Sequence, residues 1–196
     1  MLDRNSKVKS QKLKVISWTP KAGYDLNYLI KKGSQKFFFN LQKNFSQPLK
    51  VTINLKEPNT TVEVRGIFIG KSKMSFPWEL VIHHQAVNTK ANVLIKGVLD
   101  NRSQTSFKGL IKIDPQAQGI ESFLAHHTLI LNPEAKVKTS PSLEIEANQV
   151  KASHASTIHY LSDEQIFYLT SRGINPDQAK KIIIKGFIEE AKFKLK

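Results

Sequence analysis

The hydrophobic pattern of this chain changes from a strand-like period to a helical period near residue 162, and this change limits the folds open to it. Before that point, short runs of β-branched and apolar residues alternate partly with polar ones, as in Val51-Thr52-Ile53-Asn54-Leu55, which is typical of strands. Turn-forming residues such as Glu57-Pro58-Asn59 separate the runs. We predict strands over residues 12–18, 24–30, 36–41, 49–55, 61–68, 79–83, 92–98, 106–113, 122–132 and 143–147.

The arrangement of these strands is left open by the pattern. Since no helical periodicity lies between the runs, a doubly wound parallel sheet is not expected. The spacing of the turn signals fits a sandwich, a barrel or a β-solenoid equally well, and no exact repeat period appears in the sequence.

The C-terminal segment predicts two helices joined by a short linker. Ser162 and Gln165 form a capping box, and Gly173 is placed to end the first helix in a left-handed conformation. Pro176 suits the first position of the second helix. Gly186 inside that helix costs about 1 kcal/mol relative to alanine and suggests that another backbone comes close. The apolar stripe of the hairpin predicts packing on the end of the β body, covering an edge, or a groove for a partner. Residues of the second helix that share this stripe are Ala179, Ile182, Ile183, Gly186, Phe187 and Ala191.

Composition excludes several classes of protein. The 40% hydrophobic content suffices for a packed core, and no apolar run is long enough to span a membrane. No cysteine is present, so the chain alone offers no disulfide, no thiol nucleophile and no thiolate ligand. The net charge of +14 is spread singly and without a platform of stacked aromatic residues, so we interpret it as a solvated surface rather than a nucleic-acid site. The N-terminus lacks the apolar core of a signal peptide, and we expect a cytoplasmic protein.

No constellation of residues predicts catalysis, and we expect that the chain is not an enzyme. The histidine pairs His83-His84 and His126-His127 should point to opposite faces of their strands, so neither pair should chelate one ion. Phosphate-binding loops and nucleophile elbows are missing. Leu143 and Ile145 alternate with glutamates, which is the ordinary pattern of a half-buried strand.

Residues 143–157 and 165–174 nevertheless carry a specific signature. A Pro-x-Leu-Glu-Ile strand is followed by Ala152-Ser153-His154-Ala155-Ser156-Thr157, similar to a Cys-Ser-His-Gly-Ala-Thr turn, and then by Phe-Tyr-Leu-Thr-Ser-Arg-Gly-Ile on a helix. In order and spacing, these elements resemble the C-terminal part of the SufB/SufD family, the scaffold subunits of the SUF iron–sulfur cluster assembly system. The resemblance extends back to about Val81 and is closest to SufD-type sequences.

The resemblance implies a fold and a division of the chain. It implies a right-handed parallel β-helix of the SufBD type followed by a C-terminal helical hairpin. We expect a basic N-terminal lead-in over residues 1–35 whose short strands join the β body, a β-helix core over 36–160 and a two-helix segment over 161–196. Since family members carry a helical N-terminal region and more β-helix, the sequence is expected to be a compact form that lacks this region.

The resemblance also implies a non-catalytic scaffold role with named contacts. A β-helix of this family pairs with a SufB-like subunit or with a second copy of itself, and its C-terminal helices dock a SufC-like ATPase. The position matching the family histidine is His154, which would ligate a transient iron–sulfur cluster shared with the partner or form a hydrogen bond at the interface. The family cysteine is replaced here by Ala152 and the glycine by Ala155, which would alter the turn if positive φ is needed there. The residues expected to contact the ATPase are Phe167, Tyr168, Arg172, Gly173 and Phe187.

Two other functions stay open at this stage. A basic β protein that binds nucleic acid would show strongly salt-dependent binding to DNA or RNA. A degenerate SufD paralogue would serve as an ATPase adaptor alone, without contact to a cluster. The sequence does not distinguish a homodimer from a heterodimer and does not identify the source of the thiolate ligands.

Overall fold

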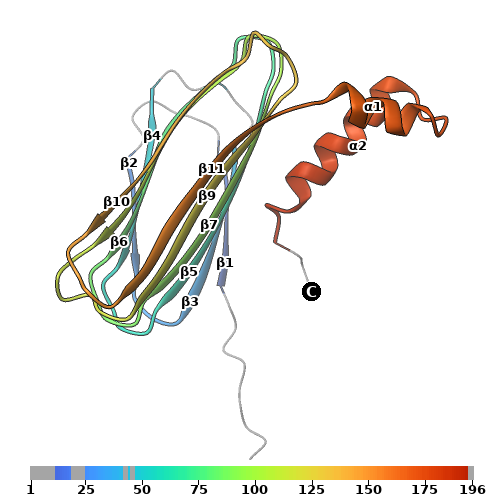
Figure 1. Ribbon diagram of the computed structural model, residues 1–196. Coiled ribbons are helices and arrows are strands. Elements are labelled where there is room, and N and C mark those ends of the chain that lie inside the picture. Colours follow the sequence, from blue (N-terminus) through green and yellow to red (C-terminus); the bar gives the residue numbers. More distant parts are fainter. Residues whose placement is uncertain (1–11, 19–24, 42–43, 45–46, 194–196) are drawn as a thin grey trace, which may run out of the picture.

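The computed structural model of the protein describes residues 12–18, 25–41, 44 and 47–193. Strands fill most of this part of the chain, and two helices follow them (Figure 1). The strands are β1 (Lys12–Trp18), β2 (Asp25–Ile30), β3 (Ser34–Leu41), β4 (Leu49–Leu55), β5 (Thr61–Gly70), β6 (Ser75–His84), β7 (Lys90–Leu99), β8 (Gln104–Ile113), β9 (Ile120–Ile130), β10 (Lys136–Ile145) and β11 (Val150–Tyr160). The helices are α1 (Asp163–Thr170) and α2 (Pro176–Glu189).

The strands form two parallel sheets that the chain visits alternately. Odd-numbered strands build a six-stranded sheet in the order β1-β3-β5-β7-β9-β11, and even-numbered strands build a five-stranded sheet in the order β10-β8-β6-β4-β2. One coil separates paired residues, as 29 residues separate Thr61 from its partner Lys90 and 31 separate Lys90 from Glu121. The result is a parallel β-solenoid of about five turns with two helices after it, which confirms the predicted fold class.

The core lies between the two sheets, because alternate residues of each strand point inward. Its largest fully buried side chains are aromatic, and their rings lie in contact: Trp78 is 5.0 Å from Phe107, and Phe68 is 5.3 Å from Phe76. Each such side chain contributes about 1.5–3 kcal/mol on burial. A continuous aromatic and aliphatic core therefore stabilises the stacked coils, and no single coil could bury its own apolar face.

At one corner of the solenoid the same backbone turn recurs in successive coils, although its residues differ. Gly33, Asn59, Asn88 and Gly119 all have positive φ, between 55° and 71°, and each begins the approach to a strand of the six-stranded sheet. The amide of Asn88 donates to the carbonyl of Gln118 in the next coil at 2.8 Å. Asparagine and glycine are the residues that tolerate this conformation best, so the same turn recurs in each coil without an identical sequence.

Several predicted boundaries change in the structure. The signature around His154 is a strand, β11, and not a turn, so the expected turn is wrong. Ala155 is not among the residues with positive φ, and the loss of glycine there has no backbone cost. The strand predicted over residues 79–83 begins earlier, so that Phe76 and Pro77 lie inside β6. Tyr24, the first residue of a predicted strand, lies outside the described residues.

The two helices form as the sequence predicts. In α1 the Gln165 amide donates to Ser162 Oγ at 3.2 Å, and the Ser162 amide donates to the Gln165 side chain at 3.4 Å. Gly173 follows with a φ of 84°, and Asn175 caps α2, with Pro176 in the first turn. Within the described residues, neither helix has the length and hydropathy needed to cross a membrane.

The position of the hairpin differs from the expectation. Helix α2 lies on the outer face of the six-stranded sheet and does not cover an edge (Figure 1). Its buried Ile188 and Ala191 pack against Ile67, Val98 and Leu129 from three neighbouring strands. The predicted stripe is therefore rotated, and Ile182 is left exposed. A Cβ atom on Gly186 would meet open space, so no backbone of the described residues approaches it closely.

Candidate functional site

His154 lies in the middle of β11, the last strand of the solenoid. It pairs in register with Leu124 of β9, whose side chain is part of the core. Because paired residues of neighbouring strands point to the same face, His154 belongs to the core-facing row of β11. It is exposed nonetheless, since no coil beyond β11 covers it among the described residues.

Part of the core-facing row of the last coil shares this exposure. Strands β10 and β11 face each other across the end of the solenoid, where Ser156 Oγ donates to Thr139 Oγ1 at 3.1 Å. Around this contact, Ile145 is 40% exposed and Ile158 is 43% exposed, whereas their register partners Ile113 and Thr128 are buried. We call this surface the open end of the solenoid and define it by Leu143, Ile145, His154, Ile158 and Tyr160.

The open end corrects one expectation about β10. Leu143 and Ile145 were expected to be half-buried in the ordinary way of a strand that covers a core. They do belong to the core-facing row, because their register partners Ile111 and Ile113 are core residues. Both are exposed by more than a third, because the coil that would cover them does not exist among the described residues.

The donor atoms at the open end fit a single ligand and not a complete metal site. Among the described residues, no group of three or more histidine, aspartate or glutamate side chains is placed to hold a metal ion. The chain has no cysteine. His154 can therefore supply one imidazole nitrogen to a metal or cluster, and every thiolate would have to come from another molecule.

The histidine pairs point to opposite faces, as strand alternation predicts. His84 is buried and contacts Thr89 Oγ1 at 2.7 Å and Ser122 Oγ at 3.0 Å, and burial, together with the charge of His83, lowers its pKa to about 4. His126 is enclosed in the core and stacks on Phe107 at 4.4 Å. Burial and the neighbouring His127 lower the pKa of His126 to about 3, and neither ring nitrogen has a hydrogen-bond partner.

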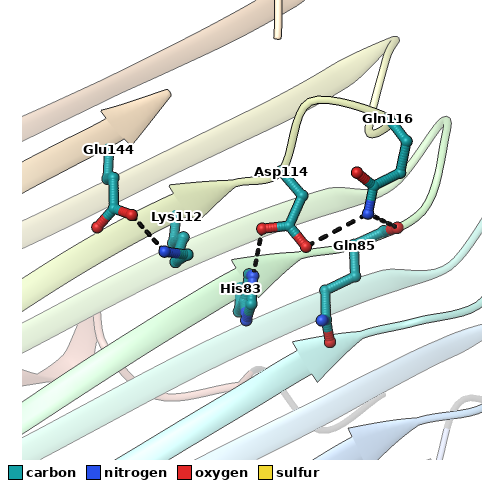
Figure 2. Close-up of polar contacts among 6 residues, drawn as sticks. All are labelled: His83, Gln85, Lys112, Asp114, Gln116 and Glu144. Atoms are coloured by element: carbon teal, nitrogen blue, oxygen red, sulfur yellow. Dashed lines mark hydrogen bonds and ion pairs between the residues drawn. The ribbon is translucent and has the colours of Figure 1, made fainter. Parts of the chain in front are cut away.

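A polar ladder crosses the outer face of the five-stranded sheet (Figure 2). His83 Nε2 contacts Asp114 Oδ1 at 2.7 Å, and Gln116 Nε2 donates to Asp114 Oδ2 at 3.4 Å. Lys112, the register partner of His83, forms an ion pair with Glu144. Burial acts to raise the pKa of Asp114, but hydrogen bonding and the charge of His83 outweigh it, so this pKa is lowered. His83 and its partner Asp114, and Lys112 and its partner Glu144, are about thirty residues apart in sequence, so the coil register was needed to find these pairs.

The expected ATPase-docking residues divide into two groups. Phe167 is 72% exposed and Tyr168 is 58% exposed on α1, which has no buried residue. The Arg172 guanidinium lies 4.8 Å from the centre of the Tyr168 ring, and Gly173 closes the same turn. Phe187 is instead half-buried between α2 and the sheet, where its ring lies 4.3 Å from Lys96 Nζ.

A second polar cluster lies beneath α2, and the sequence analysis missed it. It consists of Lys96, His127, His159 and Glu190 and borders a cavity of about 500 Å³. Its members come from three strands and from the residue that follows α2, so nothing in the local sequence connects them. The sequences of β7 and β9 give a weak signal, because Lys96 and His127 interrupt otherwise apolar runs.

Comparison with known proteins agrees with the geometry. Residues 39–187 match the family model described as the SufBD core domain of the SUF system for iron–sulfur cluster assembly. An iron–sulfur cluster assembly SufBD family protein of Mycobacterium leprae is 31% identical over 150 residues, which are 72% of this chain and 38% of the relative. A namesake from Mycobacterium tuberculosis is 34% identical over 136 residues, which are 65% of this chain and 34% of the relative.

A relative with the same family name from Staphylococcus aureus is 33% identical over 122 residues. Those residues are 62% of this chain and 26% of the relative. The chain thus spans well under half the length of the relatives that it matches. The matched region holds the described coils from β4 onward and most of the hairpin. The coiled parallel sheets, the signature on β11 and the family match together show that the chain belongs to the SufB/SufD family of iron–sulfur cluster assembly proteins.

Proposed function

We propose that the chain is a non-catalytic scaffold subunit in iron–sulfur cluster assembly. It pairs through the open end of its solenoid with a SufB-like subunit or a second copy of itself, and it docks a SufC-like ATPase through its C-terminal hairpin. The observation that carries the proposal is the uncovered core-facing row of β10 and β11. The relatives' names assign them to iron–sulfur cluster assembly, which supports the choice of process.

The open end has the physical properties of an interface. It exposes apolar side chains of the kind that the remaining coils bury, and it ends in the unpaired backbone groups of two strands. Such edges invite pairing with another chain, because each unpaired amide and carbonyl can continue the ladder. A partner solenoid that presents its own last coil would cover Ile145 and Ile158 and satisfy both strand edges.

The position of His154 suits a role at that interface. Its side chain lies on the row that a paired solenoid would cover, between Ala152 and Ser156 of the same face. The cluster is cargo in this proposal, held between two subunits and then passed on. His154 supplies one imidazole, and the partner supplies thiolates, because position 152 is alanine.

Helix α1 is the docking element of the hairpin. Phe167 and Tyr168 project from a helix that buries none of its residues, and Arg172 stacks on Tyr168 to hold its ring. Exposed aromatic residues beside an arginine are typical of interface hot spots. Phe187 acts indirectly, since it fixes α2 on the sheet and thereby sets the position of α1.

The docking is tested by light scattering of the chain mixed with the SufC-like ATPase from the same genome. We expect a stable complex that Phe167→Ser weakens by about tenfold or more, as befits the loss of an aromatic hot spot. Phe123→Ser is the matched control, because Phe123 is an exposed aromatic residue on β9, far along the chain from the hairpin. Absence of a complex at micromolar concentration, or equal weakening by both variants, would refute docking through α1.

A further inference from the structure

Lys96 occupies an unusual place for a lysine. It lies on β7 beneath α2, and its side chain is 94% shielded from solvent, with 6% exposed. Its ammonium group forms an ion pair with Glu190, just after α2, and lies 4.3 Å from the centre of the Phe187 ring. Lysine is almost never fully buried unless it is paired. The seating of α2 therefore depends on a charge beneath it as well as on apolar contacts.

Two histidines extend this charged contact across the sheet. His127 of β9 is the register partner of Lys96. Its Nδ1 atom lies 2.5 Å from Thr157 Oγ1, and the same hydroxyl lies 3.1 Å from Nε2 of His159 on β11. Lys96, His127, His159 and Glu190 border the cavity of about 500 Å³ between α2 and the sheet. Polar side chains from three neighbouring strands therefore gather around one cavity beneath α2.

The electrostatics of the network favour a neutral His127 while α2 is in place. Burial lowers the pKa of His127, and the positive charges of Lys96 and His159 lower it further, against a smaller opposite effect of Glu190. The hydrogen bond and charge of Lys96 lower the pKa of Glu190. The docked arrangement is thus a buried cation and a carboxylate, and an additional proton on His127 would add a second cation beside the first.

The remaining contacts of α2 contain no histidine. Lys180 forms an ion pair with Asp100 at 3.5 Å, and Lys192 pairs with Glu189 on the helix itself. Apolar contacts, among them those of Ile188 and Ala191, make up much of the interface. Tyr160 and Gln165 line the same cavity. His127 is therefore the group through which mild acid can act on α2.

We propose that Lys96, His127, His159 and Glu190 form a proton-operated latch, which holds α2 on the six-stranded sheet near neutral pH and releases it when His127 takes up a proton. Release lets water reach His127 and separates Glu190 from the sheet. It also uncovers Ile183, Ile184 and Phe187, which the docked helix keeps half-buried.

The direction follows from linkage. A released His127 is hydrated and has an ordinary pKa of about 6.5. The docked His127 has a lower pKa, so the released state binds the proton more tightly. Docking is therefore at full strength above the released-state pKa and weakens as the pH falls below it. The latch makes no assumption about what the hairpin binds, and it acts in the isolated chain.

The latch is tested by hydrogen–deuterium exchange of the full chain at about pH 7.5 and about pH 5.5. Histidine changes charge within this pH range. Exchange is corrected for the intrinsic effect of pH and compared between peptides from α2 and peptides from the buried strand β8. We expect α2 to lose up to about tenfold of its protection at the lower pH, because pH 5.5 lies about one unit below the ordinary pKa of histidine, while β8 keeps its protection.

Variants separate the latch from general acid instability. His127→Gln combined with His159→Gln should remove the response of α2 to pH. Lys96→Met should reduce it, because a protonated His127 would then have no buried cation beside it. His83→Gln is the control, since His83 lies on the outer face of the other sheet and should leave the response unchanged. Equal loss of protection in α2 and β8, no loss in α2, or a full response in the double variant would overturn the proposal.

Discussion

Gly97→Ala should destabilise the protein, although alanine is the smallest possible addition. Gly97 lies in β7 opposite Phe68 of β5, and the Phe68 ring covers the glycine. An added Cβ atom would stand 1.9 Å from Cζ and 2.3 Å from Cε2 of that ring. Phe68 cannot move away freely, because it is fully buried and in contact with Phe76 and His126.

The expected loss follows from two opposing terms. Overpacking of a close-packed core costs about 1–3 kcal/mol, and a contact this short belongs at the upper end of that range. Replacement of glycine by alanine adds about 0.4–1 kcal/mol to the free energy of unfolding, because the unfolded chain loses conformational entropy. Gly97 does not have a positive φ, so alanine adds no backbone strain there. We therefore expect a net loss of about 2 kcal/mol in the free energy of unfolding.

Urea unfolding followed by circular dichroism measures this loss. Gly186→Ala is the matched control, since the same atom added there meets open space and removes a glycine from a helix. We expect that variant to be as stable as the parent chain or more stable, by up to about 1 kcal/mol. A Gly97→Ala protein that unfolds at the parent's urea midpoint with the same slope would refute the packing described for β5 and β7.

Three further predictions follow from the core, the buried histidines and the open end. His126→Phe should raise the free energy of unfolding by about 1 kcal/mol, because it removes two unsatisfied ring nitrogens from an aromatic stack; a loss of stability in thermal melting would contradict this. The pKa of His84 is lowered to about 4 in the folded protein, whereas its unfolded value is about 6.5. The free energy of unfolding should therefore fall as the pH drops from about 6.5 to about 4, by up to about 1.4 kcal/mol per pH unit for this residue. A flat profile of urea midpoints over this pH range would count against the prediction. His154→Ala should leave thermal stability unchanged, because the side chain is exposed. The substitution should weaken the visible absorption of a cluster that is reconstituted on the paired complex. Undiminished absorption would show that His154 is not a ligand.

The sequence predicted most strands and both helices because their signals are local. Alternation in 49–55 and the capping box at Ser162 depend on neighbours within a few residues, and the structure confirms both. The coil register was beyond local reasoning, because turns with positive φ use Asn59 and Asn88 in some coils and glycine in others. That substitution conceals the repeat of about thirty residues that a solenoid requires.

The candidate site was predictable in part, for the same reason. Motif resemblance identified His154, but its place on the core-facing row required the pairing with Leu124. The strand character of β11 was missed because Ala152, Ser153 and Ser156 have little strand propensity, and the ladder with β9 overrides it. The cluster under α2 could not be predicted at all, since Lys96 and Glu190 are brought together by the packing of the hairpin on the sheet.

The open end is the central claim, and the mass of the paired complex tests it most directly. Light scattering should show a particle with the mass of two solenoids. We expect this particle when the chain is mixed with a cysteine-bearing SufB-like partner from its own genome, or when the chain alone is at high concentration. Ile158→Glu should weaken this pairing by about tenfold or more, because it places a charge within an apolar interface. Ile182→Glu, at an equally exposed isoleucine on α2, should not. A monomer under both conditions, or the same effect from both variants, would contradict the account.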